Sequence, residues 1–209
     1  MHTTPSARVA TLHDLPGLYR VCRLTGAAGA DASGAHADPD LLGHVWVGAY
    51  AVAPDAVALV VQDEGGIAGY CVGSPDTIAF ESWLEQQWLP PLRQRYPLQS
   101  AAASDARLVE RIHAWPRTDA ALAQSQPAHL HIDLLPRLQG QGWGRRLITD
   151  MAIRLHAAGA RGLHLGVSPD NTRALAAYER WGFSMLSRRP DVVLLGIGLG
   201  PAGILRPPA

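Results

Sequence analysis

The chain has 209 residues, of which 47% are hydrophobic and 17% are charged. This length suits one well-buried core and is short for two full domains, and the apolar content excludes an intrinsically disordered chain. Acidic and basic residues balance at 18 each. Bulk charge therefore indicates neither a nucleic-acid partner nor an anionic membrane, and any anion site must be local.

The two cysteines, Cys22 and Cys71, bear on the cellular compartment. The N-terminus lacks the basic and apolar stretches of a signal peptide, so two free thiols in a reducing cytoplasm are expected. No apolar run reaches the length of a membrane span. We therefore expect a cytoplasmic protein, while the sequence leaves the oligomeric state open.

The first half of the chain predicts a mixture of strands and helices. A strand over residues 7–12 precedes a helix for which Asp14 is a candidate N-cap, and a second helix is expected over residues 41–50. Runs at 56–61 and 67–72 flank Glu64-Gly65-Gly66 and predict a hairpin. Residues 75–127 are expected to form a helical insertion with helices near 80–87 and 105–114, and they carry Trp83, Trp88 and Trp115.

The second half alternates strands with helices more regularly. Residues 129–135 alternate as a strand, with Leu130, Ile132 and Leu134 on one face and His129, His131 and Asp133 on the other. A helix over 142–158, a strand over 162–167 and a helix over 171–181 follow, then strands over 183–188 and 192–199. Alternating strands and helices predict the α/β (α+β) class.

The sharpest motif is Gln139-Gly140-Gln141-Gly142-Trp143-Gly144, which lies between a predicted strand and a predicted helix. Glycines let the backbone turn tightly, and the free N–H groups of a helix start favour an anion such as a phosphate. A P-loop is excluded because Arg145-Arg146 stand where Lys-Ser/Thr is required, and the glycine spacing does not fit a dinucleotide-binding turn. A plain strand-to-helix turn stays open as the alternative.

The second motif runs from Asn171 to Phe183. Asn171 can cap its helix, and Tyr178 lies two turns further along. A phenol can hold or protonate a departing thiolate. The alternative is a tyrosine that only packs against the core.

Together the two motifs resemble the GNAT family of N-acetyltransferases. The family's pattern Gln/Arg-x-x-Gly-x-Gly/Ala is matched by Gln139, Gly142 and Gly144, and its later Asn, Ala, Tyr and Gly-Phe by Asn171, Ala174, Tyr178 and Gly182-Phe183. The resemblance implies a mixed sheet of about seven strands, splayed between residues 129–135 and 162–167, with acetyl-CoA in the splay. It also implies one domain over residues 7–200.

The resemblance further assigns roles to individual residues. Backbone groups of Leu134 and Leu135 would pair with the pantetheine arm, and Tyr178 would serve the leaving thiolate. The expected cofactor-binding set is Leu134, Leu135, Gln139, Gly140, Gln141, Gly142, Trp143, Gly144, Arg145, Asn171, Ala174 and Tyr178.

A closer resemblance covers roughly residues 8–199. The chain is similar to the acetyltransferase-like domains at the C-terminus of eukaryotic O-GlcNAcases, through segments such as His131-Ile132-Asp133, Val167-Ser168-Pro169-Asp170 and Asp191-Val192-Val193-Leu194. The glycine loop is degraded in that family and intact here. The resemblance implies a free-standing, bacterial-type relative that retains its cofactor site, and we expect no sugar hydrolysis.

The base that neutralises the attacking amine is less well marked. GNAT enzymes often use a Glu or Asp on the strand before the glycine loop, where this chain offers Asp133, with His131 as the second candidate. The alternative that Asp133 is structural, and only accepts hydrogen bonds from backbone N–H groups of the loop, stays open. His129, His131 and Asp133 on one face could also hold a metal ion, but no further ligand is visible and we expect none.

The sequence thus predicts an acetyl-CoA-dependent N-acetyltransferase acting on a small-molecule or peptide amine, with no nucleic-acid or membrane partner. Two alternatives stay open. One is an acetyl-CoA-binding module that recognises a ligand or peptide without turnover, and the other is a structural use of the fold without any cofactor.

Overall fold

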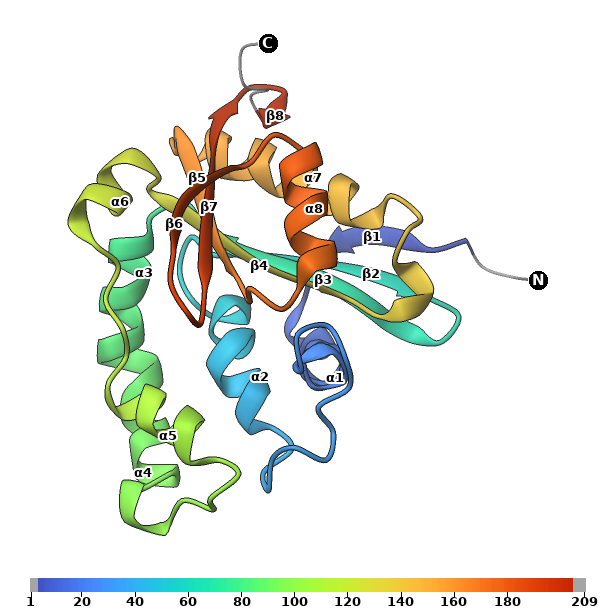
Figure 1. Ribbon diagram of the computed structural model, residues 1–209. Coiled ribbons are helices and arrows are strands. Elements are labelled where there is room, and N and C mark those ends of the chain that lie inside the picture. The colour runs from blue at the N-terminus through green and yellow to red at the C-terminus, as the bar shows by residue number, and fades with distance from the viewer. Residues whose placement is uncertain (1–3, 205–209) are drawn as a thin grey trace.

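The computed structural model describes residues 4–204, and its centre is one mixed sheet (Figure 1). The strand order is β1-β2-β3-β4-β5-β7-β6, and β8 pairs with β7. All neighbours are antiparallel except β4 and β5. The strands are β1 Ser6–Val9, β2 Val57–Asp63, β3 Gly66–Ser74, β4 Ala128–Leu134, β5 Gly162–Val167, β6 Ser184–Arg188, β7 Val193–Gly200 and β8 Gly203–Ile204.

Eight α-helices in the described residues surround this sheet. They are α1 Leu15–Thr25, α2 Leu41–Trp46, α3 Thr77–Trp83, α4 Leu89–Arg95, α5 Ala106–His113, α6 Ala120–Ser125, α7 Trp143–Ala157 and α8 Thr172–Arg180. Within residues 4–204, none of them has both the length and the apolar character that crossing a bilayer requires.

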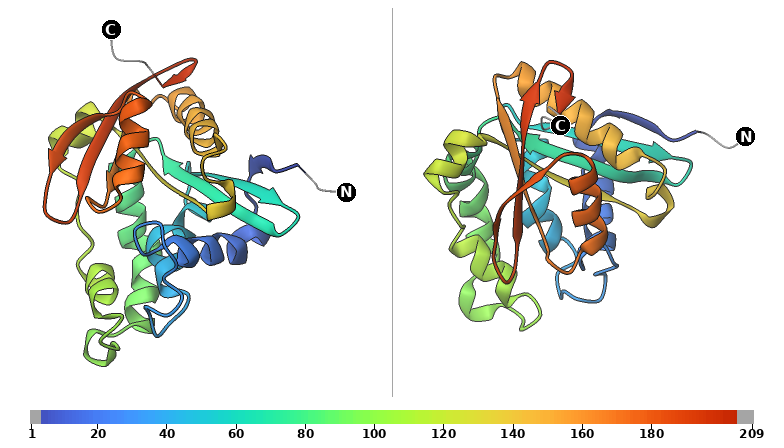
Figure 2. Two further views of the ribbon diagram at one scale, coloured as in Figure 1. Left: turned by 45° about the vertical axis from the view of Figure 1, so that its right-hand side comes forward. Right: turned by 45° about the horizontal axis from the view of Figure 1, so that its top comes forward.

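Helices α1 and α7 cover opposite faces of the sheet, and α8 lies beside the C-terminal strands (Figures 1 and 2). The stripe predicted for α7 is confirmed, because its apolar residues are fully buried in the main core; they are Leu147, Ile148, Met151, Ala152 and Leu155. Both faces of the sheet are therefore anchored, and the strand ends between them are free to form a site.

The splay predicted for the sheet is confirmed. Parallel pairing of β4 with β5 is limited to Ala128 with Leu163 and His129 with His164. From Leu130 onward β4 stays paired with β3 only, and it diverges from β5 (Figure 2). The divergence leaves one edge of β4 without a strand partner inside the sheet.

The start of the chain differs from the prediction in two ways. Strand β1 ends at Val9, and a short 3₁₀ turn spans Leu12–Asp14. Asp14 does precede α1, but its side chain does not cap that helix. Its carboxylate instead accepts hydrogen bonds from the Arg8 guanidinium at 2.6 and 2.7 Å and from the Thr11 N–H at 2.8 Å.

The second predicted helix is shorter than expected. Helix α2 ends at Trp46, and a 3₁₀ turn over Gly48–Ala51 follows. The Tyr19 side chain packs so closely here that a Cβ on Gly43 or Gly48 would lie 2.2 or 2.3 Å from it. The close tertiary contact of an aromatic ring on this segment is not visible in its local sequence pattern.

The insertion contains four helices rather than the two predicted. A π-helical turn, Leu84–Trp88, joins α3 to α4, and α5 and α6 follow. Buried residues of α2 to α5 form a second hydrophobic cluster, against which Trp83, Trp88 and Trp115 pack.

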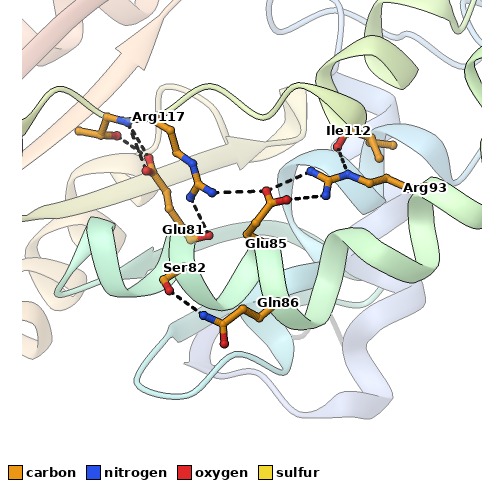
Figure 3. A network of polar contacts seen from close by, with 8 residues as sticks. Glu81, Ser82, Glu85, Gln86, Arg93, Ile112 and Arg117 are labelled. Atoms are coloured by element: carbon orange, nitrogen blue, oxygen red, sulfur yellow. Dashed lines mark hydrogen bonds and ion pairs between the residues drawn. The ribbon is translucent and has the colours of Figure 1, made fainter.

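Polar contacts tie the segment after α5 back to α3 and to the π-helical turn (Figure 3). Glu81 accepts from the Thr118 N–H at 3.0 Å and from the Thr118 hydroxyl at 2.6 Å. Glu85 receives two hydrogen bonds from Arg93 and lies 3.4 Å from Arg117. The insertion is therefore a packed unit beside α2.

Candidate active site

The glycine loop turns through two left-handed residues before α7. Gly140 has φ +76° and Gly142 has φ +84°, a region that residues with a Cβ enter only with strain. Gly142 is the N-cap of the 15-residue α7, and a Cβ built on it would meet nothing within 4 Å. No described residue accepts a hydrogen bond from the first N–H groups of the helix, and such a free helix start favours an anion.

Side-chain hydrogen bonds hold this loop in place. Gln139 donates to the Leu134 carbonyl at 2.7 Å, and Gln141 donates to the Arg137 carbonyl at 2.7 Å. Arg137 in turn pairs with Asp63 of β2 at 2.6 Å. The side chains of Gln139 and Gln141 thus brace the loop. The Gln139 N–H is donated to the Pro136 carbonyl at 3.1 Å, while no described residue accepts from the N–H groups of residues 140–145.

Basic side chains gather around the same loop. Arg145 is exposed on the first turn of α7, and the Arg146 guanidinium lies 4.3 Å from the centroid of the buried Trp143 ring. Arg173 of α8 donates to Gln139 Oε1 at 2.8 Å and approaches Gly140. The sequence reading missed Arg173, although its place two residues after the capping Asn171 was a usable signal.

The exposed edge of β4 departs from the expectation at one residue. The Leu135 N–H donates to the Ala68 carbonyl at 2.9 Å, and the Leu135 carbonyl accepts from Leu138 N–H at 2.9 Å. Both groups of Leu135 are thus engaged within the protein. Because backbone directions alternate along an antiparallel strand, Ile132 and Leu134 point their groups toward the splay.

Helix α8 forms the opposite wall. Asn171 caps it by accepting from the Ala174 N–H at 3.1 Å, as predicted. Its amide also lies 3.7 Å from the position of a Cβ on Gly29, so it borders the loop between α1 and α2. Asn171 therefore orders both the helix start and its surroundings.

Tyr178 is 7% exposed and packs edge-on against Trp181 and Phe183. No described residue hydrogen-bonds to its hydroxyl. Burial, reinforced by the charges of Cys71 and Asp133, raises the Tyr178 pKa far above its usual value. The phenol therefore keeps its proton at neutral pH and can donate a hydrogen bond.

Asp133 lies at the centre of a polar cluster that also contains Tyr70, His131 and Cys22. The Tyr70 hydroxyl donates to Asp133 Oδ2 at 2.5 Å, across the β3–β4 pair, and His131 Nε2 lies 3.2 Å from the same oxygen. Asp133 and His131 are 19% and 32% exposed. Tyr70 and Cys22 were missed because they lie far from β4 in the sequence.

The electrostatics of this cluster separate the two candidate bases. Burial alone would lower the His131 pKa, but the Asp133 carboxylate and the Cys22 side chain outweigh it and raise the pKa to about 10. His131 is therefore an imidazolium at neutral pH and has no free lone pair on Nε2. Asp133 remains the proton acceptor of the pair.

His129 has a structural role instead. Its Nε2 bonds the Tyr50 hydroxyl and its Nδ1 the Thr77 hydroxyl, both at 2.8 Å. Burial, with smaller effects from His164 and His131, lowers its pKa to about 3. With both ring nitrogens engaged, His129 does not fit the metal-ligand set considered from the sequence. The ligand atoms that do converge within 4.8 Å belong to Cys22, His131 and Asp133.

The comparisons with known proteins bear on the whole arrangement. The model of the acetyltransferase (GNAT) family matches residues 35–183, which is more than half of the chain. The chain belongs to the GNAT family. A GNAT chain is expected to combine a splayed β4–β5 pair with a glycine loop before α7 and a tyrosine on α8. All three features are present.

Individual relatives agree with this membership. The crystal structure of SsHAT superposes with a TM-score of 0.83 at 31% identity, covering 94% of this chain and 98% of that one. Protein O-GlcNAcase of Rattus norvegicus is 26% identical over 94% of this chain, which spans only 23% of that relative's length. The structure of yncA from Salmonella typhimurium, with its cofactor acetyl-CoA, shares the fold at a TM-score of 0.56 and 14% identity, covering 95% of each chain.

Proposed function

We propose that this GNAT chain is an acetyl-CoA-dependent N-acetyltransferase for an amine acceptor. The observation that carries the proposal is the meeting of three features at the splay: the open glycine loop, the unbonded Tyr178 hydroxyl and the Asp133 carboxylate. Residues 7–200 would form the single domain that performs the reaction.

The residues present fit acetyl-CoA. The loop N–H groups between Gln139 and Gly144, with Arg145 and Arg173, suit a pyrophosphate, and the β4 edge at Ile132 and Leu134 suits an amide-containing arm. Trp143 would contribute only its backbone, since its ring is buried in the core. Ala174 would form part of the α8 surface that faces the cofactor. Bound acetyl-CoA supplies an acetyl group activated as a thioester.

At the reacting end the protein offers an acceptor and a donor of hydrogen bonds. Asp133, directly or through a water, would take the proton from the attacking amine, and His131 Nε2 lies 3.2 Å from Asp133 Oδ2. The Tyr178 hydroxyl would donate a hydrogen bond to the thioester sulfur. Because its pKa lies above that of a thiol, it stabilises the thiolate rather than giving up its proton.

A non-catalytic acetyl-CoA module is the second candidate. It is favoured by the lack of a glutamate on β4 and by the protonated state of His131.

We also propose a cytoplasmic location, because Cys22 and Cys71 are both free thiols.

Calorimetric titration of acetyl-CoA and CoA into the pure protein tests the cofactor site. We expect micromolar binding to the wild type and none to Gly142→Glu, because the new carboxylate would occupy the anion position. Gly142→Ala is the matched control: it meets nothing within 4 Å and carries only the cost of its positive φ, roughly 1 kcal/mol. Absence of binding to the wild type would refute the proposal and would leave only a structural use of the fold.

A further inference from the structure

Arg111 of α5 is a cation without an anion. Its guanidinium lies between two indole rings, 4.6 Å from the Trp46 centroid and 5.0 Å from that of Trp115. Its Nε is buried and makes no hydrogen bond, and no ion pair joins Arg111 to any other residue in the part of the chain that the structure describes. A half-buried guanidinium in this state is unusual, because buried charges are normally paired.

The surroundings of Arg111 do not supply the missing partner. Burial lowers its pKa, and Arg107, one turn earlier on α5, adds a second positive charge. Asp191, which is exposed, and the Tyr50 hydroxyl act on it only at longer range. Three other arginines of the insertion have carboxylate partners: Arg93 and Arg117 pair with Glu85, and Arg95 pairs with Asp38. Arg107 has no carboxylate partner among the described residues either, but it is exposed to water, whereas Arg111 is partly buried against two indole rings.

Arg111 also lies close to the reacting end of the site. Trp46 also contacts His131: the two rings are stacked at 5.8 Å between centroids and 27° between planes. Successive contacts thus connect Arg111 through Trp46 and His131 to Asp133. Two opposite charges, the Arg111 guanidinium and the Asp133 carboxylate, flank one tryptophan and one histidine.

We propose that the acceptor is a small amine that also carries a carboxylate, with its carboxylate bound by Arg111 and its amine presented at Asp133. The inference rests on the proposed function and names its substrate class. A planar guanidinium between two indoles is held in one orientation, which suits a carboxylate better than it suits a spherical ion. The insertion, which supplies Arg111 and Trp115, then confers acceptor specificity.

The first test is binding to the protein without acetyl-CoA. The probes are the straight-chain amino acids from β-alanine to ε-aminocaproate, each compared with its primary amide. Binding is detected by saturation-transfer NMR, and its affinity is measured by titration. We expect at least one acid to bind the wild type about tenfold more tightly than its amide, and Arg111→Gln to remove that difference. Arg154→Gln, which alters a surface arginine paired with Asp150 on α7, is the matched control and should bind like the wild type.

Arg111→Lys keeps the charge but loses the planar fork, so it should bind the acids with intermediate affinity, and its circular dichroism spectrum checks that folding is retained. Equal binding of acids and amides, no binding of any acid, or wild-type binding by Arg111→Gln would each overturn the proposal.

Turnover with acetyl-CoA separates the proposed acetyltransferase activity from the proposed carboxylate-bearing acceptor. Acetylation that ignores the carboxylate would refute this inference alone, and Arg111-dependent binding without acetylation would refute only the proposed activity.

Discussion

At the scale of single residues, the site depends on one proton held by burial and one held by a neighbouring charge. Tyr178 and His131 both keep a proton at neutral pH, the first because its phenolate would be desolvated and the second because Asp133 stabilises its charge. Asp133 is left as the group that can accept one. This division of roles between neighbouring groups is what acid–base chemistry at one pH requires.

Replacement of Tyr178 tests its part in that division. Tyr178→Phe should keep the fold, since the ring still packs between Trp181 and Phe183. We expect kcat for an accepted amine to fall by roughly 10- to 100-fold, while the calorimetric Kd for acetyl-CoA stays the same. An unchanged kcat would contradict the role of the hydroxyl. Tight acetyl-CoA binding with no accepted amine would favour the non-catalytic module.

Replacement of His131 tests the ion pair through stability. Between pH 6.5, its ordinary pKa, and about 10, its folded pKa, the folded protein holds one more proton than the unfolded chain. The stabilisation from the pair is therefore complete below pH 6.5 and declines as pH rises to about 10.

Urea unfolding of the wild type and of His131→Gln across this pH range measures the effect. The difference in free energy of unfolding should shrink with rising pH. A difference that stays constant would show that the pair is not charged in the folded state.

At the scale of elements, each wall of the site has its own support. The glycine loop is held by Gln139 and Gln141, and α8 is capped by Asn171. The insertion depends on Glu81, which is 7% exposed and bonds both the N–H and the hydroxyl of Thr118.

Loss of the Glu81 carboxylate should loosen the insertion. Glu81→Ala leaves the Thr118 N–H without its acceptor, and we expect a loss of about 1–3 kcal/mol in the free energy of unfolding. Ser82→Ala, on an exposed position of the same helix, removes only the hydroxyl that accepts from Gln86 and should change stability little. Chemical denaturation of both variants measures this, and equal losses would contradict the assignment to Glu81.

At the scale of the whole molecule, the sheet is open at its centre. Strands β4 and β5 are joined by two residue pairs only and then diverge at the proposed cofactor site (Figure 2). A ligand that fills the splay should therefore stabilise the entire fold, since it binds the folded state alone.

Thermal unfolding with and without acetyl-CoA tests this coupling. At a hundredfold excess of free ligand over Kd, the expected stabilisation is about 2.7 kcal/mol. For a chain of this size that corresponds to a rise in Tm of roughly 5–10 °C. The same ligand should leave the Tm of Gly142→Glu unchanged, and a rise in that variant would place acetyl-CoA elsewhere on the protein.

The sequence by itself determined the elements around the site. The alternation of β4, the stripe of α7 and the capping Asn171 are local patterns, and they predicted the strand, the helix and the cap that the structure contains. These features follow from residues that are neighbours along the chain. The splay of the sheet was implied by the resemblance to the GNAT family that the two motifs carry.

Only the tertiary structure decided which side chains meet. Tyr70 and Cys22 join Asp133 from β3 and α1, and Arg111 reaches Trp46 from the insertion. His129 and His131 lie on one face of β4 and look equivalent in sequence, yet His129 is neutral and His131 is charged. Their partners come from segments distant in sequence, and the pKa of a buried group depends on those partners rather than on its chain neighbours.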